Sequence, residues 1–287
     1  MTAKILDGKA VADSILDKVK DKIDECKLHN LSLCFIRVGD DQASEVYVRN
    51  KERACEKIGI KSNTYVLHDG AVKPEIIDLI ENLNNDDTVG GILVQLPLPD
   101  SFGWIDEREI INAIAPSKDV DCFVEANVGS MFKGDSVLVP CTPYGIMEML
   151  DYYDINVTGM NCVVIGRSDI VGKPMAMMLL HNNATVTICH SYTENLKDIC
   201  KRADLIVSAV GKPKFINRDY VGDGAIVIDV GMNRDENGKL CGDVDFDDVV
   251  DVASYITPVP GGVGRTTVAA LMINFYNTNC SEDDELL

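Results

Sequence analysis

The stretch NCVVIGRSDIVGKPMAMMLL, residues 161–180, has the pattern of a strand, a glycine turn and a helix. Residues 162–165 are apolar and rich in β-branched side chains, as is usual for a strand buried on both faces of a parallel sheet. Gly166 and Gly172 bound the turn, and Pro174 stands where a helix can begin without losing a backbone hydrogen bond. Such a turn should direct backbone N–H groups and the positive helix end at one point, which suits a phosphate. We therefore predict a nucleotide-binding unit around this stretch.

The residues after the next strand favour NADP over NAD. Residues 184–189 read as a second buried strand, and no acidic residue stands at its end, where an NAD site usually holds the ribose 2′-hydroxyl. Arg167 and Ser168 from the first turn, with Ser191 from the second, would instead present one cation and two hydroxyl groups to a 2′-phosphate. The motif Gly-x-Gly-x-x-Gly is absent, so an ordinary sheet turn with a solvated arginine is the alternative.

The composition is that of a soluble globular protein. The 287 residues are 46% hydrophobic and 25% charged, and they are enough for two domains with separate cores. The net charge of −19 argues against binding to nucleic acid or to an anionic membrane surface. We find no membrane-spanning run and no secretory signal. The ten cysteines include no Cys-x-x-Cys pair, so we expect reduced thiols in a cytoplasmic protein and no metal site.

Strands and helices alternate along the chain, which predicts an α/β fold with parallel sheets and right-handed crossovers. We expect two lobes with a cleft between them, each a mostly parallel sheet flanked by helices. Residues 1–141, completed by a C-terminal helix at about 266–287, would form the catalytic domain. Residues 142–265 would form a Rossmann-like dinucleotide-binding domain, in which Thr142 caps the first helix. Residues 232–243 contain the turn signal of a hairpin that could pair across a dimer.

Four polar side chains of the first domain are candidates for chemistry. Tyr47 and Lys51 stand four residues apart, hence on one face of a predicted helix. Gln95 ends a predicted strand and Asp121 lies in a loop, where ligands of parallel sheets usually bind. Each also has an ordinary interpretation: a solvated lysine, a tyrosine at the core edge, an amide that ties a loop, a carboxylate that caps a turn. The glycine-rich residues 261–264 allow close backbone approach to a ligand or form a flexible connection.

Five segments occur in a fixed order along the chain: SEVYVRNK (44–51), VQLPLP (94–99), KDVDCF (118–123), VIGRSDIVGKP (164–174) and TPVPGGVG (257–264). Together they closely resemble the bifunctional methylenetetrahydrofolate dehydrogenase/methenyltetrahydrofolate cyclohydrolase family, from Ile5 to the last predicted helix. The resemblance implies that Lys51 is the main catalytic group and that Tyr47 stacks on the folate. It further implies that Gln95 hydrogen-bonds to the lysine and that Asp121 holds the pterin ring.

The resemblance also implies two sets of contacts. The substrate contacts are Tyr47, Val94, Gln95, Leu96, Pro97, Asp121, Pro260, Gly261, Gly262, Val263 and Gly264. The NADP contacts are Thr142, Gly166, Arg167, Ser168, Val171, Ser191, Gly211, Gly231, Met232 and Thr267. The sequence shows three departures from the family pattern: Cys122 replaces a usual glycine, the pair Arg265-Thr266 replaces Pro-Met, and Met232 replaces isoleucine.

In the implied reaction, hydride passes from the one-carbon bridge of 5,10-methylenetetrahydrofolate to NADP. Water then opens the methenyl cation to give 10-formyltetrahydrofolate. A charged amine would repel that cation, so we expect Lys51 to act uncharged, as a general base or by hydrogen bonding to water. The family also implies a homodimer and a place in one-carbon metabolism and purine biosynthesis. The alternatives are a monofunctional or NAD-preferring methylenetetrahydrofolate dehydrogenase, a two-lobed enzyme similar to shikimate dehydrogenase, and a non-catalytic dinucleotide-sensing protein.

Overall fold

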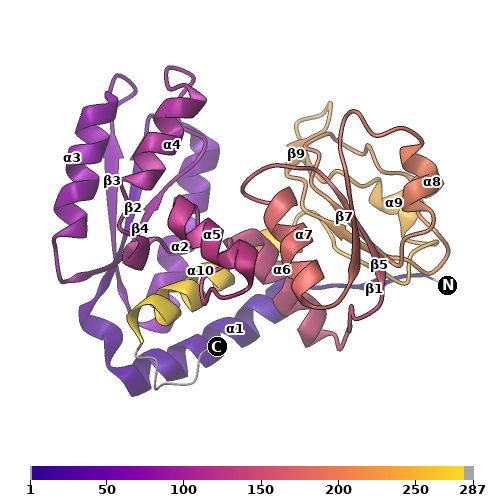
Figure 1. Cartoon of the computed structure of the whole chain (residues 1–287), viewed down its shortest axis with the longest axis horizontal. Helices are drawn as coiled ribbons and strands as arrows, with labels where there is room; N and C mark the ends of the chain where they lie inside the picture. Colours follow the sequence, from indigo (N-terminus) through magenta and orange to yellow (C-terminus); the bar gives the residue numbers. More distant parts are fainter. Residues whose placement is uncertain (1, 281–287) are drawn as a thin grey trace. The chain divides into compact units, whose positions relative to one another are not determined.

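The structure is a computed structural model that describes residues 2–280. Within this range the chain divides into two compact units (Figure 1). Unit 1 contains residues 2–13 and 142–267, and unit 2 contains residues 14–141 and 268–280. The N-terminal segment therefore differs from the domain assignment made from sequence, because its strand pairs with the sheet of unit 1. Three helices contain the unit boundaries: α1 (Gly8–Cys26), α6 (Cys141–Tyr152) and α10 (Val263–Asn279).

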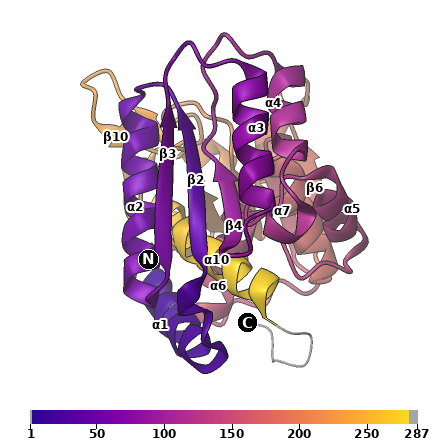
Figure 2. The same cartoon turned by 90° about the vertical axis from the view of Figure 1, so that its left-hand side faces the viewer.

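Unit 2 is built on a three-stranded parallel sheet in the order β3-β2-β4 (Figure 2). Its strands are β2 (Ser32–Val38), β3 (Lys61–Leu67) and β4 (Val89–Val94). Its helices are α2 (Gln42–Ile58), α3 (Lys73–Asn84), α4 (Trp104–Asn112) and α5 (Glu125–Lys133), with short 3₁₀ turns at Leu28–Asn30 and Pro116–Lys118.

The central strand β2 is buried on both faces, as its apolar sequence predicts. Cys34 and Ile36 point to one face, in a core that includes Ile76 and Ile80 of α3. The same core includes residues of α4. On the alternate positions of β2, Leu33 lies close to Gly91 of β4, as does a phenylalanine of α10. The alternation of β2 thus attaches helices of unit 2 to its sheet.

The two ends of α2 have clear causes in the sequence. The carboxylate of Asp41 accepts a hydrogen bond from the backbone N–H of Ser44 at 2.7 Å, which caps the first turn. Gly59 ends the helix in the left-handed conformation, at φ 81°. This helix matters for function because it carries Tyr47 and Lys51.

Unit 1 contains a six-stranded sheet, parallel throughout, in the order β1-β11-β8-β7-β5-β6. Its strands are β1 (Lys4–Ile5), β5 (Asn161–Ile165), β6 (Thr185–Cys189), β7 (Leu205–Ser208), β8 (Ile226–Asp229) and β11 (Tyr255–Ile256). Its other elements are α7 (Gly172–His181), α8 (Leu196–Cys200), a 3₁₀ turn (Arg218–Tyr220), α9 (Phe246–Val249) and the hairpin strands β9 (Asn233–Arg234) and β10 (Leu240–Cys241). The α/β class and the parallel sheets expected from the sequence are confirmed.

Two expectations for unit 1 were wrong in detail. Strand β6 was predicted to be buried, but it forms the edge of the sheet and exposes Thr185, Thr187 and Ile188. Its alternating Thr and β-branched apolar residues suit an edge as well as a centre. Thr142 was predicted to cap α6, but the helix already begins at Cys141, so Thr142 lies in its first turn.

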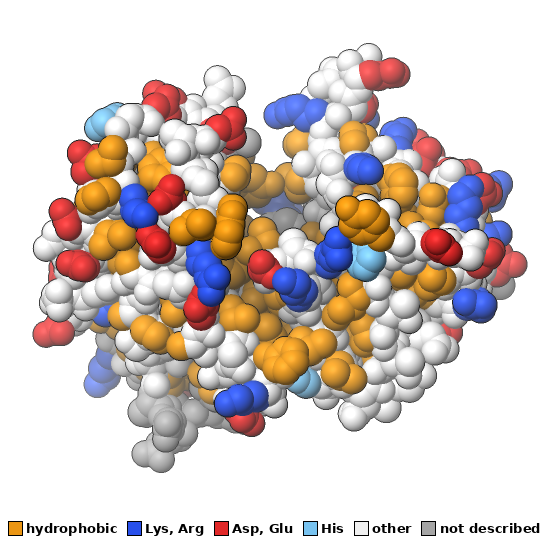
Figure 3. All heavy atoms as spheres, turned by 45° about the horizontal axis from the view of Figure 1, so that its top comes forward, with side chains coloured by type: hydrophobic (Ala, Val, Ile, Leu, Met, Phe, Trp, Pro, Cys, Tyr) orange, Lys and Arg blue, Asp and Glu red, His pale blue; other side chains and the backbone are white. Residues whose placement is uncertain are grey.

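The predicted hairpin is present: β9 and β10 pair antiparallel, with Gly238 at φ 76° in the turn. These two strands form a sheet of their own. On the face that Figure 3 shows, acidic and basic side chains lie interspersed with apolar ones, although the net charge is −19. None of the helices between residues 2 and 280 combines the length and the apolarity needed to cross a membrane.

Candidate active site

Lys51 and Gln95 meet at the carboxyl end of the sheet of unit 2. The ammonium nitrogen Nζ of Lys51 donates a hydrogen bond to Oε1 of Gln95 at 3.0 Å. Lys51 is only 9% exposed, and within the described residues it has no ion pair with a carboxylate. Gln95 is fixed in turn, because its backbone N–H donates to Ile36 O at 2.8 Å and its Nε2 donates to Leu96 O at 2.6 Å. A lysine that is buried against a neutral amide is suited to chemistry rather than to solvation.

Tyr47 lies one helical turn before Lys51 and is half-buried. Burial raises the pKa of its phenol, so the ring remains neutral at physiological pH. A neutral aromatic face beside the lysine can stack on a planar ring. The structure therefore places these two predicted residues on one face of α2.

The loop after β4 holds the next three predicted substrate contacts. Val94 is the last residue of β4 and is buried in the core of unit 2. Leu96 is half-buried and Pro97 is exposed. The sequence identified this loop by its prolines, which cannot continue a ladder of hydrogen bonds.

Asp121 is linked to a buried thiol that the sequence did not single out. Burial, together with the Asp121 carboxylate that hydrogen-bonds to it, raises the pKa of the Cys141 thiol, while the charge of Lys51 opposes this rise. The thiol also donates to Val120 O at 3.4 Å. The charges of two predicted catalytic groups, Asp121 and Lys51, therefore both affect the pKa of the Cys141 thiol. No spacing motif in the sequence marks this cysteine.

A buried carboxylate, Asp119, organises the loop that carries the half-buried Asp121. It accepts hydrogen bonds from the backbone N–H groups of Phe123 and Val124 and from Nδ2 of Asn127, at 2.9–3.2 Å. Burial raises its pKa in spite of these donors. These bonds position the start of α5, a helix that the sequence did not predict. From α10, Asn274 Nδ2 also donates to Val120 O at 2.8 Å.

The glycine turn of unit 1 needs its two glycines. Gly166 has φ 137°, and a Cβ placed on it would lie 2.5 Å from Ala209 O. A Cβ on Gly172 would overlap the carbonyl group of Gly166. The turn therefore forms a tight cradle at the carboxyl end of β5, with the exposed side chains of Arg167 and Ser168 at its rim.

The start of α7 differs from the expectation that it offers several N–H groups to a phosphate. The hydroxyl oxygen of Ser168 accepts from the N–H groups of Val171 and Gly172, both at 3.3 Å, and Ser168 O accepts from Lys173 N at 3.0 Å. These three donors are therefore engaged within the turn. Ser191, which follows the neighbouring strand β6, is exposed and offers its own hydroxyl group.

The loops after β7 and β8 are fastened by Asp243. Its carboxylate accepts from the N–H groups of Val210, Gly211 and Lys212 at 2.7–3.3 Å and from Nδ2 of Asn233 at 2.8 Å. Gly211 is exposed at φ 65°. In the next loop a Cβ on Gly231 would collide with the Asp243 carboxylate, while Met232 is 47% exposed. The sequence did not identify Asp243, although it determines the shape of both predicted cofactor loops.

The predicted substrate loop, residues 260–264, and the remaining cofactor residues also belong to unit 1. Gly261 has φ 111°, and its carbonyl oxygen accepts from Gly8 N at 3.0 Å. Pro260 and Gly264 are exposed, and Gly262 and Val263 are buried. The hydroxyl oxygens of Thr142 and Thr267 lie 3.2 Å apart. The predicted residues thus form two groups, one within each unit.

Comparison with known proteins identifies the family of the chain. The sequence model of the tetrahydrofolate dehydrogenase/cyclohydrolase catalytic domain matches residues 6–121, and that of the NAD(P)-binding domain of the same family matches residues 140–283. The chain belongs to the tetrahydrofolate dehydrogenase/cyclohydrolase family. The bifunctional protein FolD of Agathobacter rectalis is 54% identical over 274 residues, which cover 95% of this chain and 97% of that protein.

Solved structures of the tetrahydrofolate dehydrogenase/cyclohydrolase family agree with the fold. The bifunctional enzyme FolD from Campylobacter jejuni gives a TM-score of 0.92 at 46% identity, covering 96% of this chain and 98% of that one. The enzyme FolD of Trypanosoma brucei, in complex with NADP cofactor and inhibitor, gives a TM-score of 0.91 at 34% identity, covering 97% and 98%.

The departures from the pattern of the tetrahydrofolate dehydrogenase/cyclohydrolase family have local structural settings. Cys122 adopts φ 59°, the left-handed conformation that a glycine at this position would adopt without strain. Its thiol is buried and donates to Leu138 O at 3.4 Å. Thr266 is fully buried against Gly145 and donates its hydroxyl to Val263 O at 3.0 Å, whereas Arg265 is exposed.

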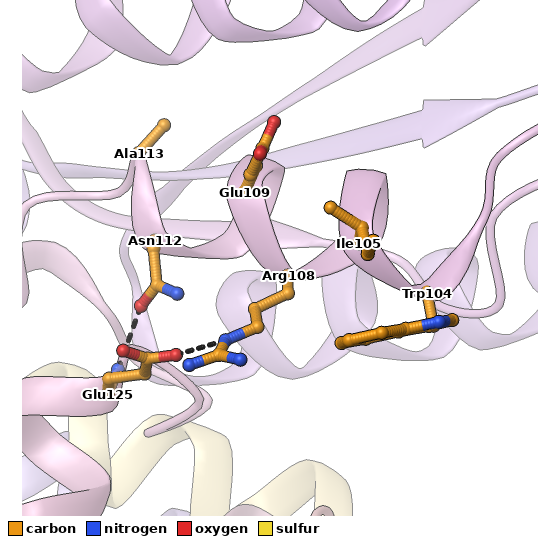
Figure 4. Close-up of a pocket in the computed structure, with 7 residues that line it drawn as sticks. All are labelled: Trp104, Ile105, Arg108, Glu109, Asn112, Ala113 and Glu125. Atoms are coloured by element: carbon orange, nitrogen blue, oxygen red, sulfur yellow. Dashed lines mark hydrogen bonds and ion pairs between the residues drawn. The ribbon is translucent and has the colours of Figure 1, made fainter.

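A separate pocket of unit 2 contains none of the predicted site residues. It has a volume of about 540 Å³ and lies along α4 beside the start of α5 (Figure 4). Arg108 forms an ion pair with Glu125 at one end of the lining residues, and the ring of Trp104 lies at the other end. Its remaining lining residues are Ile105, Glu109, Asn112 and Ala113.

Proposed function

We propose that Lys51 and Gln95 carry the hydrolytic step of a bifunctional folate one-carbon enzyme. The chain is an NADP-dependent methylenetetrahydrofolate dehydrogenase and a methenyltetrahydrofolate cyclohydrolase. It oxidises 5,10-methylenetetrahydrofolate to 5,10-methenyltetrahydrofolate and hydrolyses this product to 10-formyltetrahydrofolate. The observation that carries the assignment of residues is the 3.0 Å hydrogen bond between buried Lys51 and Gln95, inside the matched catalytic domain.

Unit 2 binds and activates the folate. The ring of Tyr47 stacks on the pterin, and the Asp121 carboxylate accepts hydrogen bonds from its N–H groups. The loop from Val94 to Pro97 supplies backbone contacts. Within unit 1, the predicted substrate loop at residues 260–264 exposes Pro260 and Gly264, and Gly261 adopts φ 111°.

Lys51 acts on the water that attacks the methenyl carbon. The uncharged amine takes one proton from the water as the new C–O bond forms. The bond between the carbon and N5 then breaks, and the hydroxyl proton passes to N5, which leaves the formyl group on N10. Lys51 finally releases its proton to solvent. Gln95 holds the amine in place, because its own amide group is fixed to the loop backbone.

The residues of unit 1 fit NADP by their chemistry. NADP, when bound, accepts the hydride from the one-carbon bridge. The two glycines of the cradle permit its tight backbone turn, since a Cβ at either would overlap backbone atoms of the protein itself. Arg167, Ser168 and Ser191 hold the 2′-phosphate by charge and hydrogen bonds. Further contacts come from Thr142, Val171, Gly211, Gly231, Met232 and Thr267.

One assay tests the whole assignment. The purified protein is mixed with 5,10-methylenetetrahydrofolate and NADP, and the absorbance of the methenyl product is followed as it forms and decays. We expect formation with NADP to exceed that with NAD, followed by enzyme-dependent decay. Formation without accelerated decay would indicate a monofunctional dehydrogenase. A protein that binds NADP but turns over no folate would be a dinucleotide sensor, and the function proposed here would be wrong.

We further propose that the enzyme is a cytoplasmic homodimer in which the β9–β10 hairpin contributes to the interface. The hairpin pairs with no other strand within the described residues, so its outer edges retain donors and acceptors for a partner. Light scattering should give twice the chain mass for the wild type. A variant with a shortened turn at residues 235–239 should form a weaker dimer, with a higher dissociation constant. A wild-type protein with the mass of a single chain would rule out the dimer.

A further inference from the structure

Arg167 is held by an aromatic ring and by no described carboxylate. Its guanidinium carbon Cζ lies 5.6 Å from the centroid of the Tyr192 ring, which is within the range of a cation–π contact. The neighbouring Asp169 is engaged by Lys173 instead. The net charge of the protein is −19, so carboxylates are abundant. An arginine whose N–H groups pair with none of the described carboxylates is available to bind an external anion.

Tyr192 has no role in the core that would explain its presence. It is 81% exposed and follows strand β6. Strand β6 pairs with β5, the strand that leads to Arg167. Local bonds fix its backbone, because Tyr192 N donates to His190 Nδ1 at 3.2 Å. The His190 ring also meets the Tyr192 ring edge-on, with centroids 6.2 Å apart. An exposed aromatic ring in a turn with a fixed backbone can hold a neighbouring side chain in one orientation, here that of Arg167.

We propose that Tyr192 is a specificity-determining residue of the NADP site, which positions Arg167 for the 2′-phosphate. The inference rests on the proposed use of NADP. A guanidinium is planar, so it can lie on an aromatic face while its N–H edge grips a phosphate with two hydrogen bonds. The stacking also reduces the side-chain freedom that an exposed arginine would lose when the ligand binds.

The effect of Tyr192 should distinguish NADP from NAD. Only a ligand that contacts Arg167 benefits from a preorganised guanidinium, and NAD carries no 2′-phosphate. Loss of the ring should therefore weaken binding of NADP and leave binding of NAD unchanged. Because Tyr192 lies outside the hydrophobic cores, its replacement should also leave the fold intact.

The experiment compares the wild type with Tyr192→Ala and Tyr192→Phe in two measurements. Calorimetry gives the affinities for 2′,5′-ADP and for 5′-AMP, and the dehydrogenase assay gives kcat and KM with NADP and with NAD. For Tyr192→Ala we expect about two- to fivefold weaker binding of 2′,5′-ADP and a matching rise of KM for NADP. The affinity for 5′-AMP, the KM for NAD and kcat should not change. Tyr192→Phe keeps the ring and should behave as the wild type.

The Arg167→Ala background supplies the matched control. If the ring acts through the arginine, Tyr192→Ala should cause no further loss of 2′,5′-ADP binding in that background. Equal losses for 2′,5′-ADP and 5′-AMP, or a Tyr192→Phe protein as weak as Tyr192→Ala, would overturn the inference. A wild type that discriminates between the two nucleotides but turns over no folate would refute the proposed function and leave the role of Tyr192 standing.

Discussion

The backbone N–H of Asp243 donates a hydrogen bond to Oδ1 of Asp229 at 2.9 Å, so one buried carboxylate supports the segment that carries another. Asp229 also accepts from Gly231 N and Val244 N, each at 2.9 Å. Asp243 in turn fastens the loops that follow β7 and β8. The shape of two predicted cofactor loops therefore depends on two buried acidic side chains, Asp229 and Asp243.

The pH dependence of stability should reveal this pair. Burial, reinforced by the charge of Asp243, raises the pKa of Asp229 to about 7, whereas an unfolded aspartate titrates near pH 4 (about 3.9). The folded protein then binds the proton more tightly than the unfolded chain. The free energy of unfolding should thus fall as pH rises from about 4 to about 7, by about 4 kcal/mol for this group, and its contribution should stay constant above that range.

Urea unfolding of the wild type and of Asp229→Asn, measured between pH 5 and pH 8, checks this expectation. The wild type should lose more stability over that interval than the variant, since asparagine does not titrate. The comparison uses the difference in slope, because the amide also disturbs the bond to Val244 N and lowers stability at every pH. Equal slopes would show that Asp229 does not titrate in this range.

Replacement of Lys51 by methionine should abolish the cyclohydrolase reaction. Methionine fills a similar apolar volume but can neither accept a proton nor donate to Gln95, and general-base catalysis contributes on the order of 10²–10⁴ in rate. NADP binding should persist, because the residues that hold it lie in unit 1. Lys57→Met, on the same helix but paired with Asp17 at the surface, is the control and should keep full activity. An unchanged hydrolysis rate in Lys51→Met would remove Lys51 from the mechanism.

Gln95→Glu should shift the cyclohydrolase activity toward higher pH. The substitution places a carboxylate about where Oε1 now accepts from Lys51 Nζ, and a nearby negative charge favours the ammonium form. Hydrolysis of methenyltetrahydrofolate, followed from pH 6.5 to 9, should be slower than in the wild type at neutral pH and should recover as pH rises. A uniform loss across the range would indicate that Gln95 acts only by positioning.

Site residues could be predicted from the sequence where neighbouring positions along the chain mark them, and could not where only tertiary contacts do. Tyr47 and Lys51 could be placed on one face because four residues make one helical turn, and Gln95 was marked by the prolines that end its strand. Cys141 could not be found in this way, because its link to Asp121 joins residues twenty positions apart and depends on burial. Asp243 escaped for the same reason, since its partners come from two other loops.

The fold shows the same division between local and tertiary signals. The apolar run at residues 162–165 located β5, but nothing in the composition of β6 distinguishes an edge strand from a central one. Helix α5 was not predicted because its N-cap residue is Val124, whose side chain cannot form a capping hydrogen bond. Asp119, five residues earlier, instead fixes the start of the helix by accepting a hydrogen bond from the backbone N–H of Val124. Such information arises only when the chain has folded.

The glycine cradle offers a last test with a matched control. Gly172→Ala would push a methyl group into the carbonyl of Gly166, which is backbone and cannot move aside cheaply. We expect a loss of more than about 1 kcal/mol of stability and a raised KM for NADP, with folate binding retained. Gly129→Ala, in α5 with open space around the new methyl group, should instead stabilise by up to about 1 kcal/mol and leave both activities unchanged. Thermal unfolding and cofactor titration of the two variants decide the matter: an unaltered KM in Gly172→Ala would show that the cofactor does not use this turn.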